Sequence, residues 1–271
     1  MAVELEIQDG NPWWLSPDVW VVPGPDPTGP PGTPIAGQTA FLWARVRNNG
    51  RTRVDNATVR FYWANPAVGF DRTTATFVGS ANVTLNGGQV EDVLCLAPWQ
   101  VVWINDGHEC ILAEVFHPSD PLPPGPAFNV PTDRHVAQRN LSVVMAVKGF
   151  FHFAFEVHNP TRQPRVYRVF AEPGEVEQVK PLVPTLGRDF RLPPQGKLAE
   201  FGFVEATCPE PESIAQARPE APKFELQPGG RTGFSLVGRI EGGGALIHVS
   251  QEADGQIVGG LSVLAISAEG R

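Results

Sequence analysis

Imidazole and carboxylate side chains gather in one part of the chain. These are the side chains that bind metal ions or transfer protons during catalysis. The set comprises Asp106, His108, Glu109, His117, Asp120, Asp133 and His135. Two kinds of chemistry suit such a set: a zinc or calcium site, or the activation of water in a metal-dependent hydrolase.

Spacing divides this set into two groups. The residues from Cys110 to Phe116 are expected to form an extended strand, which at roughly 3.3 Å per residue places His108 and His117 about 30 Å apart. The two imidazoles therefore cannot bind one ion. The candidate metal ligands expected at a single end of the domain are His117, Asp120, Asp133 and His135. The alternative is that these side chains only tie down a proline-rich loop by hydrogen bonds.

Other catalytic signatures are missing from the sequence. Neither a Gly-x-Ser-x-Gly turn nor the Cys-then-His signature of a thiol enzyme is present. The glycines from Gly242 to Gly244 precede an apolar run, whereas a phosphate-binding loop precedes a helix, so we interpret them as a hairpin turn. We therefore expect a protein that is not an enzyme.

Tryptophan is confined to the first half of the chain, at Trp13, Trp14, Trp20, Trp43, Trp63, Trp99 and Trp103. Large aromatic side chains fill cores and also form binding surfaces for sugars or protein strands, and both interpretations stay open. In the run Phe41–Arg47, strand alternation places Trp43 on the same face as Arg45. The candidate binding surface comprises Trp13, Trp14, Trp20, Trp43 and Arg45.

Short apolar runs must position these side chains. They include Phe41–Arg47, Ala57–Trp63, Val101–Ile104, Val136–Val144, Phe150–Asn159 and Ile257–Ile266, with turns rich in glycine and asparagine between several of them. Helical periodicity is almost absent. This pattern is typical of β-sandwiches.

Composition sets limits on partners and location. A chain of 271 residues accommodates two domains of ordinary size. The net charge of −8, with no run of Lys or Arg, lacks the electrostatic footprint of a nucleic-acid binder. Residues 1–11 do not resemble a secretory signal, and no stretch of about 18 apolar residues occurs, so we expect no membrane insertion and a cytoplasmic or non-classically exported protein.

The chain has 3 cysteines, at Cys95, Cys110 and Cys208. An odd set without close pairing favours reduced thiols in the core. A Cys95–Cys110 bridge stays open as the alternative for an extracellular protein, because the two residues fall on strands expected to be neighbours.

The apolar runs form two sets that match in order. Val46-Arg47-Asn48 corresponds to Val157-His158-Asn159, the turn Leu85–Gly88 to Leu226–Gly230, and Leu141–Val144 to Leu261–Leu264, each of the last pair as the final strand of its half. A boundary near residue 144 satisfies these matches. The predicted domains are therefore 1–144 and 145–271.

This order of motifs resembles the bacterial cell-adhesion-related (CARDB) domain and similar bacterial immunoglobulin-like modules. The residues that carry the resemblance are Val46, Asn48, Leu85 and Gly88 in the first half, and Val157, Asn159, Leu226, Pro228 and Gly229 in the second. The segments 23–34 and 118–131 are longer than such a module needs. The resemblance implies a β-sandwich with an adhesive or structural role.

These observations predict an all-β chain of two tandem immunoglobulin-like β-sandwich domains. We expect a non-catalytic structural or adhesive binding module that holds no cofactor and associates with a protein partner or with itself. Two alternatives remain: a carbohydrate-binding protein that uses exposed tryptophans, and a metal-dependent hydrolase at the His/Asp loop site.

Overall fold

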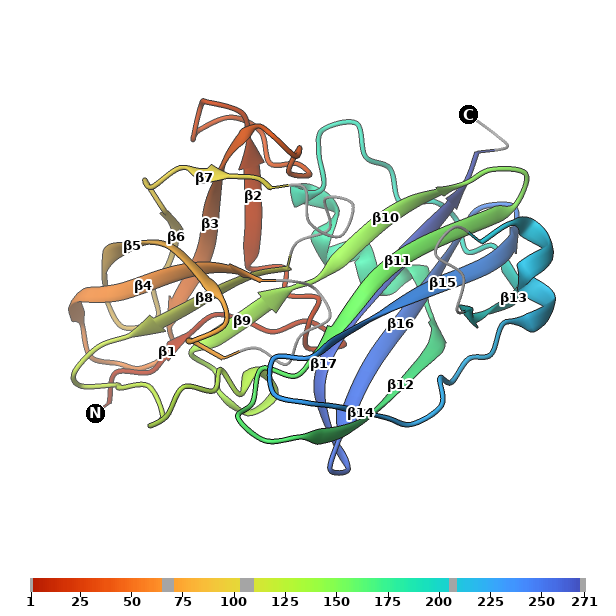
Figure 1. Cartoon of the computed structure of the whole chain (residues 1–271). Helices are drawn as coiled ribbons and strands as arrows, with labels where there is room; N and C mark the ends of the chain where they lie inside the picture. Colours follow the sequence, from red (N-terminus) through yellow and green to blue (C-terminus); the bar gives the residue numbers. More distant parts are fainter. Residues whose placement is uncertain (1, 65–70, 103–109, 205–208, 269–271) are drawn as a thin grey trace. The chain divides into compact units, whose positions relative to one another are not determined.

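A computed structural model describes residues 2–64, 71–102, 110–204 and 209–268, and most of them lie in β-strands (Figure 1). Contacts divide the chain into two compact units. Of the described residues, the first unit contains those up to Ala64, those within Asp71–Arg139 and the segment Pro181–Phe190, and the second contains those within Asn140–Lys180 and Arg191–Arg271. No helix in the described part of the chain is long and apolar enough to cross a membrane.

Two sheets form the first unit (Figure 1). In one, β3 (Thr39–Asn48) is central and pairs with β1 (Leu5–Glu6), β2 (Val19–Pro23), β6 (Val90–Leu94) and β7 (Trp99–Gln100). The other has the order β5 (Thr76–Leu85), β4 (Val54–Ala64), β8 (Cys110–Phe116) and β9 (Val136–Arg139). A short 3-10 helix, η2 (Val130–Thr132), precedes β9.

The core of the first unit is built from the inward faces of both sheets. Leu42, Ala44 and Val46 on β3 are fully buried and share one cluster with Phe61 on β4 and Ala113 on β8. Their neighbours along β3 face away from this cluster, as strand alternation requires. Two sheets that close over one apolar interior make this unit a β-sandwich.

Two further sheets form the second unit. The larger has the order β10 (Leu141–Ala146), β17 (Gln256–Ser267), β16 (Gly244–Ala253), β12 (Arg165–Gly174) and β14 (Phe224–Leu226). The smaller has the order β11 (Phe150–His158), β15 (Arg231–Glu241) and β13 (Lys197–Val204). The 3-10 helix η4 (Pro211–Gln216) also belongs to this unit, whereas the residues of η3 (Val176–Thr185) are divided between the two units after Lys180.

The core of the second unit also draws on both of its sheets. Phe151, Phe153 and Phe155 of β11 lie in one buried cluster with Ile247 of β16 and Val263 of β17. The aromatic face of β11 is thus a core face. The strand itself lies at the edge of its three-stranded sheet. The chain is an all-β protein with an immunoglobulin-like sandwich architecture.

The last predicted strand of the first half is arranged differently in the structure. The run Val136–Val144 is divided at Asn140 into β9 and β10, and β10 pairs in parallel with β17 of the second unit, Leu141 opposite Ser262. The division by contacts accordingly falls between Arg139 and Asn140. β10 therefore closes a sheet of the second unit, although the sequence repeat indicates the end of the first half.

The interpretation of Gly242–Gly244 as a hairpin turn is wrong. These glycines connect β15 to β16, and the two strands belong to different sheets of the second unit. Gly242 and Gly243 adopt positive φ angles of 65° and 52°, which only glycine adopts at low cost. A tract of this kind supplies the sharp change of direction that a crossing between sheets requires.

Candidate functional site

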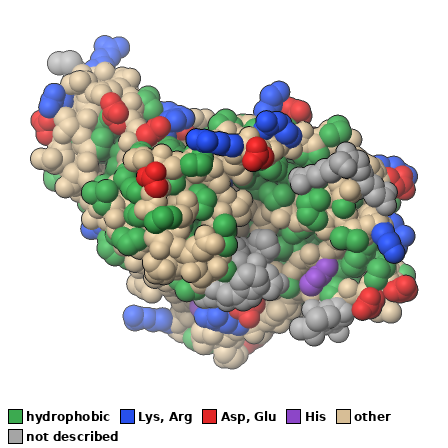
Figure 2. Space-filling view, turned by 90° about the horizontal axis from the view of Figure 1, so that it is seen from above, with side chains coloured by type: hydrophobic (Ala, Val, Ile, Leu, Met, Phe, Trp, Pro, Cys, Tyr) green, Lys and Arg blue, Asp and Glu red, His purple; other side chains and the backbone are tan. Residues whose placement is uncertain are grey.

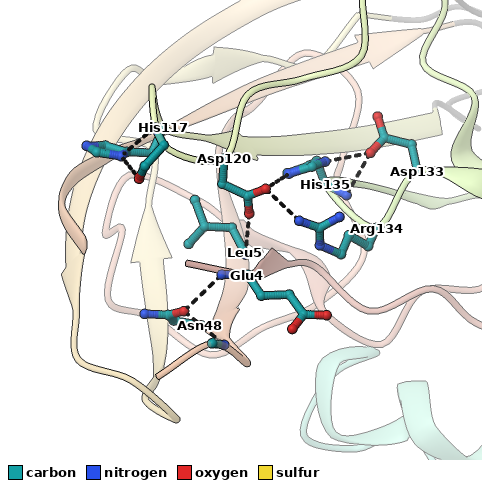
Figure 3. A network of polar contacts seen from close by, with 10 residues as sticks. Glu4, Leu5, Asn48, His117, Asp120, Asp133, Arg134 and His135 are labelled. Carbon is teal, nitrogen blue, oxygen red and sulfur yellow. Dashed lines mark hydrogen bonds and ion pairs between the residues drawn. The ribbon is translucent and has the colours of Figure 1, made fainter. Parts of the chain in front are cut away.

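The hypothesis of a metal site places His135 near two carboxylates, and the structure does bring these three side chains together (Figure 3). The Nδ1 atom of His135 lies 2.7 Å from Oδ1 of Asp133, and its Nε2 atom lies 3.2 Å from Oδ1 of Asp120. The second contact has the distance of an ion pair but not the geometry of a hydrogen bond. All three residues are buried.

Both carboxylate oxygens of Asp120 are already used in contacts with the protein, which would have to break before Asp120 could bind a metal ion. Its Oδ2 atom accepts a hydrogen bond of 2.6 Å from the backbone N–H of Leu5, and its Oδ1 atom lies 2.5 Å from Nη2 of Arg134 (Figure 3). The carboxylate thus joins the N-terminal strand β1 to a segment 115 residues further along the chain. This arrangement is a structural anchor.

His117 does not belong to the network (Figure 3). Its Nδ1 atom lies 2.6 Å from Oγ of Ser119, and backbone hydrogen bonds in both directions join His117 to Asp120 in a tight turn. Among the described residues, no group of three His, Cys, Asp or Glu side chains could hold a metal ion. The candidates Asp106, His108 and Glu109 lie outside the described residues.

The charges of this network shift the pKa values of His135 and Asp133. Burial acts against the charged imidazole of His135, but the hydrogen bond to Asp133 and the negative charges of Asp120 and Asp133 outweigh it and raise its pKa. The pKa of Asp133 is lowered, because the bonds to His135 outweigh the opposing effect of burial. The pKa of nearby Asp9 is raised to about 8, first by burial and then by the charges of Glu6 and Asp133.

The candidate binding surface is partly assembled on the outer face of the sheet around β3. Trp20 on β2 is the cross-strand partner of Trp43 on β3, and their rings stack with 6.0 Å between centroids and 10° between planes. The guanidinium of Arg45 lies 5.6 Å from the Trp20 ring centroid and pairs with Asp92 on β6. Three neighbouring strands thus contribute one row of aromatic and charged groups.

Little of this aromatic surface is open to solvent. Trp20 is 6% exposed and Trp14 is 4% exposed, while Trp13 and Trp43 are half-buried. Trp13 and Trp14 lie against each other edge to face, with ring centroids 5.1 Å apart. A platform for sugars needs free indole faces, and these four rings are mostly used in packing.

The long proline-rich segments are held down by specific contacts. The indole N–H of Trp43 donates to the carbonyl oxygen of Pro27 at 3.0 Å. Nη1 of Arg72 donates to the carbonyl oxygens of Gly125 and Ala127 at 3.1 and 2.8 Å. The segments 23–34 and 118–131 therefore cover the outer faces of the first unit.

Arg72, which holds the segment 118–131, is itself bound by Glu114 on β8. Glu114 is fully buried. Its Oε1 atom accepts a hydrogen bond of 2.8 Å from the Tyr62 hydroxyl, and its Oε2 atom accepts one of 2.8 Å from Nε of Arg72. Burial and the Glu114 charge raise the pKa of Tyr62 to about 12. The sequence signal for this ion pair was a single charged residue, Glu114, inside the apolar run Cys110–Phe116.

Cys95 and Cys110 are buried free thiols in the structure, as the odd cysteine count favours. Burial raises the pKa of both, so both remain protonated at neutral pH. Cys208 lies outside the described residues.

The sheet edge on the β5 and β6 side of the first unit carries a feature that the sequence analysis did not single out. β5 has the sequence TFVGSANVTL over ten residues, with no charged side chain, and pairs only with β4 among the described residues. Phe77 on β5 is 53% exposed, and Leu96, directly after β6, is 75% exposed. Natural edge strands are usually protected by charges, prolines or bulges on the outer side, and the side chains of β5 lack the first two.

Comparisons with known proteins show only distant structural likenesses. No family model matches the chain, and no curated protein matches it either. Among solved structures, the N-terminal domain of PorA is 12% identical, covers 48% of this chain and 89% of its own, and has a TM-score of 0.28. Red sea bream transglutaminase is 11% identical, covers 93% of this chain and 31% of its own, and has a TM-score of 0.23.

The calcium binding domain CBD12 of CALX1.1 is a further structural match. It is 12% identical, covers 78% of this chain and 74% of its own, and has a TM-score of 0.21. Likenesses at this level concern the fold alone. The chain is an all-β protein of immunoglobulin-like sandwich architecture, and its function has to be argued from its own residues.

Proposed function

We propose that the protein is a non-catalytic structural or adhesive module, in the manner of the CARDB-like modules that its motif order resembles, and that it associates with a second copy of itself. The observation that carries the proposal is the uncovered edge of β5. Its outward N–H and C=O groups are available for pairing with another strand, because among the described residues only β4 pairs with it.

Three properties of β5 favour strand addition. The strand is ten residues long, and a register shift between Phe77 and Gly79 leaves Gly79–Leu85 as the stretch along which an added strand gains backbone hydrogen bonds. It carries no charge, so two copies meet without repulsion. The exposed ring of Phe77 supplies apolar area beside this edge.

The polar clusters of the first unit fit a structural role. Asp120 and His135 hold β1 in place, and Glu114 with Arg72 holds the loop near Ala127. Such side chains are used in folding rather than presented to a substrate. Figure 2 shows hydrophobic side chains in several separate groups between charged ones on one face of the molecule.

The proposal is tested by light scattering at increasing protein concentration. We expect species above the monomer mass of 29.4 kDa. The variants Ser80→Lys and Asn82→Lys add charges to exposed positions of β5 and should shift the protein towards monomer. Gln38→Lys, which adds the same charge at an exposed position away from β5, is the matched control. A strictly monomeric wild type at high concentration contradicts the proposal.

A further inference from the structure

A groove lies in the second unit, whereas the candidate metal ligands and the described tryptophans belong to the first. It has a volume of about 880 Å³ and is lined by β13, β14, β15 and the segment that follows η4. Pockets for small organic ligands usually measure about 300 to 1,000 Å³. The groove is therefore large enough for a ligand of ordinary size.

One wall of the groove is aromatic. Phe234 on β15 lies 5.3 Å from Phe224 on β14 and 5.9 Å from Phe203 on β13, measured between ring centroids. Phe203 is buried, whereas Phe224 and Phe234 are half-buried and line the open space. Three phenyl rings from three strands make an apolar surface that suits a hydrocarbon or aromatic body.

A glycine lies where the groove meets the sheet. Gly233 is an exposed residue inside β15, the central strand of its sheet, and no described atom lies within 4 Å of a Cβ built on it. Glycine weakens a strand interior and often marks a place where a ligand approaches the backbone. Since neighbouring residues of a strand point to opposite faces, a side chain at this position would point away from the face that carries Phe234, and Gly233 borders the groove with its backbone.

The rim of the groove is positive in a chain whose net charge is −8. Arg218 and Lys223 are exposed, and neither forms an ion pair with a carboxylate within the described part of the chain. Among the described residues, the lining holds one carboxylate, Glu220, and both of its oxygens are bound by Arg168 at 2.6 and 3.0 Å. The pKa of Glu220 is lowered first by its hydrogen bonds from Arg168 and also by the charge of Lys223, so Lys223 acts on Glu220 without forming an ion pair with it.

The segment that carries Arg218 is firmly held. The backbone of Arg218 exchanges hydrogen bonds with Phe203 on β13, and the neighbouring carbonyl of Pro219 accepts a hydrogen bond from Ala171 on β12. Because strands of both sheets bind this segment, the backbone from which the Arg218 side chain extends is fixed in place. A preformed rim lowers the ordering cost of binding a ligand.

We propose that this groove binds an amphipathic organic acid, with its apolar body against Phe224 and Phe234 and its carboxylate at Arg218 and Lys223. The inference is independent of self-association through β5, which belongs to the other unit. Only an anion with an apolar body uses both the phenyl wall and the cations of the rim. A neutral or cationic amphiphile leaves the cations unpaired or repels them.

The proposal is tested with the full chain and the fluorescent anion 8-anilinonaphthalene-1-sulfonate as the probe, displaced by decanoate. We expect saturable binding, displacement by decanoate, and at least about tenfold weaker displacement by decanol or decyltrimethylammonium, since a charge-assisted hydrogen bond is lost. Equal displacement by all three amphiphiles would overturn the proposal.

Variants locate the site. Lys223→Glu should weaken decanoate by about tenfold, and Arg218→Glu, which reverses the other charge of the rim, should do the same. Lys180→Glu makes the same charge change at an exposed position outside the groove lining and should leave affinity unchanged. If both groove variants bind decanoate like the wild type, the groove is not the site. The comparison of the three amphiphiles on the wild type stays decisive if a variant fails to fold.

Discussion

The side-chain amide of Asn159 donates a hydrogen bond of 2.9 Å to the carbonyl oxygen of Leu226, 67 residues further along the chain. The first unit contains the same relationship, because the amide of Asn48 donates to the carbonyl oxygen of Leu85 at 3.5 Å. In each unit the backbone of the asparagine also exchanges two hydrogen bonds with the turn after that leucine. A buried asparagine thus fixes the same turn twice.

Replacing Asn159 should destabilise the protein strongly. Its side chain also donates to Gln163 and accepts from Thr161 and the Tyr167 hydroxyl, all at 3.0 Å or less. Asn159→Ala leaves several of these groups buried without partners, and we expect a loss of about 3 kcal/mol in the free energy of unfolding. Denaturant unfolding followed by circular dichroism measures it, because the tryptophans lie in the first half of the chain and do not report on this unit, with the exposed Asn82→Ala as a control near zero. A loss below about 1 kcal/mol would show that water replaces the amide.

The buried pair of Glu114 and Arg72 should show strong coupling. Arg72→Met leaves the fully buried Glu114 charged and should cost about 3 to 5 kcal/mol, whereas Glu114→Gln leaves the half-buried Arg72 charged and should cost less. The double variant should cost clearly less than the sum of the two. Arg53→Met removes an exposed pair with Asp55 and should cost less than about 1 kcal/mol. Additive losses in the double variant would argue against a direct interaction.

Asp9 should make the protein less stable as pH rises. Its pKa is raised to about 8 in the folded state from 3.8, so the folded protein retains a proton that the unfolded chain has released. The folded state binds more protons between these pH values, and the free energy of unfolding falls as pH rises from about 4 to 8. An amide at this position would not titrate, so Asp9→Asn should gain stability relative to wild type at pH 8 compared with pH 5. An equal difference at both pH values would contradict this.

His248 should have the opposite effect in a lower range. Burial lowers its pKa from 6.5 to about 4, and its ring contacts Ser262 at 2.8 Å and Gln178 at 3.2 Å. The unfolded chain binds a proton there that the folded protein excludes, so stability present above pH 6.5 is lost as pH falls towards 4. His248→Gln should flatten this part of the stability curve, which thermal unfolding between pH 4 and 7 records. If His248→Gln loses stability between pH 7 and pH 4 as the wild type does, other groups cause that loss.

Sequence patterns predicted the parts of the fold that depend on local alternation and turns. The alternation in β3 identified Leu42 and Ala44 as facing opposite to Trp43, and the repeated Val-x-Asn motif marked the asparagines that fix the turns. Each of these patterns involves residues that are only a few positions apart in the sequence. The positions of strands and turns can therefore be predicted from the sequence alone.

The pairing of strands that are far apart in the sequence could not be predicted in this way. Leu141–Val144 and Leu261–Leu264 were expected to be the final strands of separate halves, yet the two segments pair with each other in parallel in one sheet. Strand pattern specifies a face but not a partner, so the pairing of similar strands has to be decided by the whole fold.

The candidate site shows the same limit. Spacing brought Asp133 and His135 together, because they lie two positions apart in the sequence, but it could not show that Asp120 is bound by the Leu5 amide or that His117 turns to Ser119. Tryptophan count likewise indicated a surface without showing that Trp20 is covered by Trp43. Contacts formed by distant segments decide whether polar or aromatic side chains are free.

Hydrogen exchange of the β5 amides at two protein concentrations tests the central claim most directly. If the edge of Thr76–Leu85 pairs with a second copy, its outward amides should exchange more slowly at high concentration, and Ser80→Lys should remove that protection. Amides of β4, which is paired on both sides, serve as the internal reference. Exchange of β5 that is independent of concentration, in a protein that light scattering shows to self-associate, would place the interface elsewhere and contradict the account.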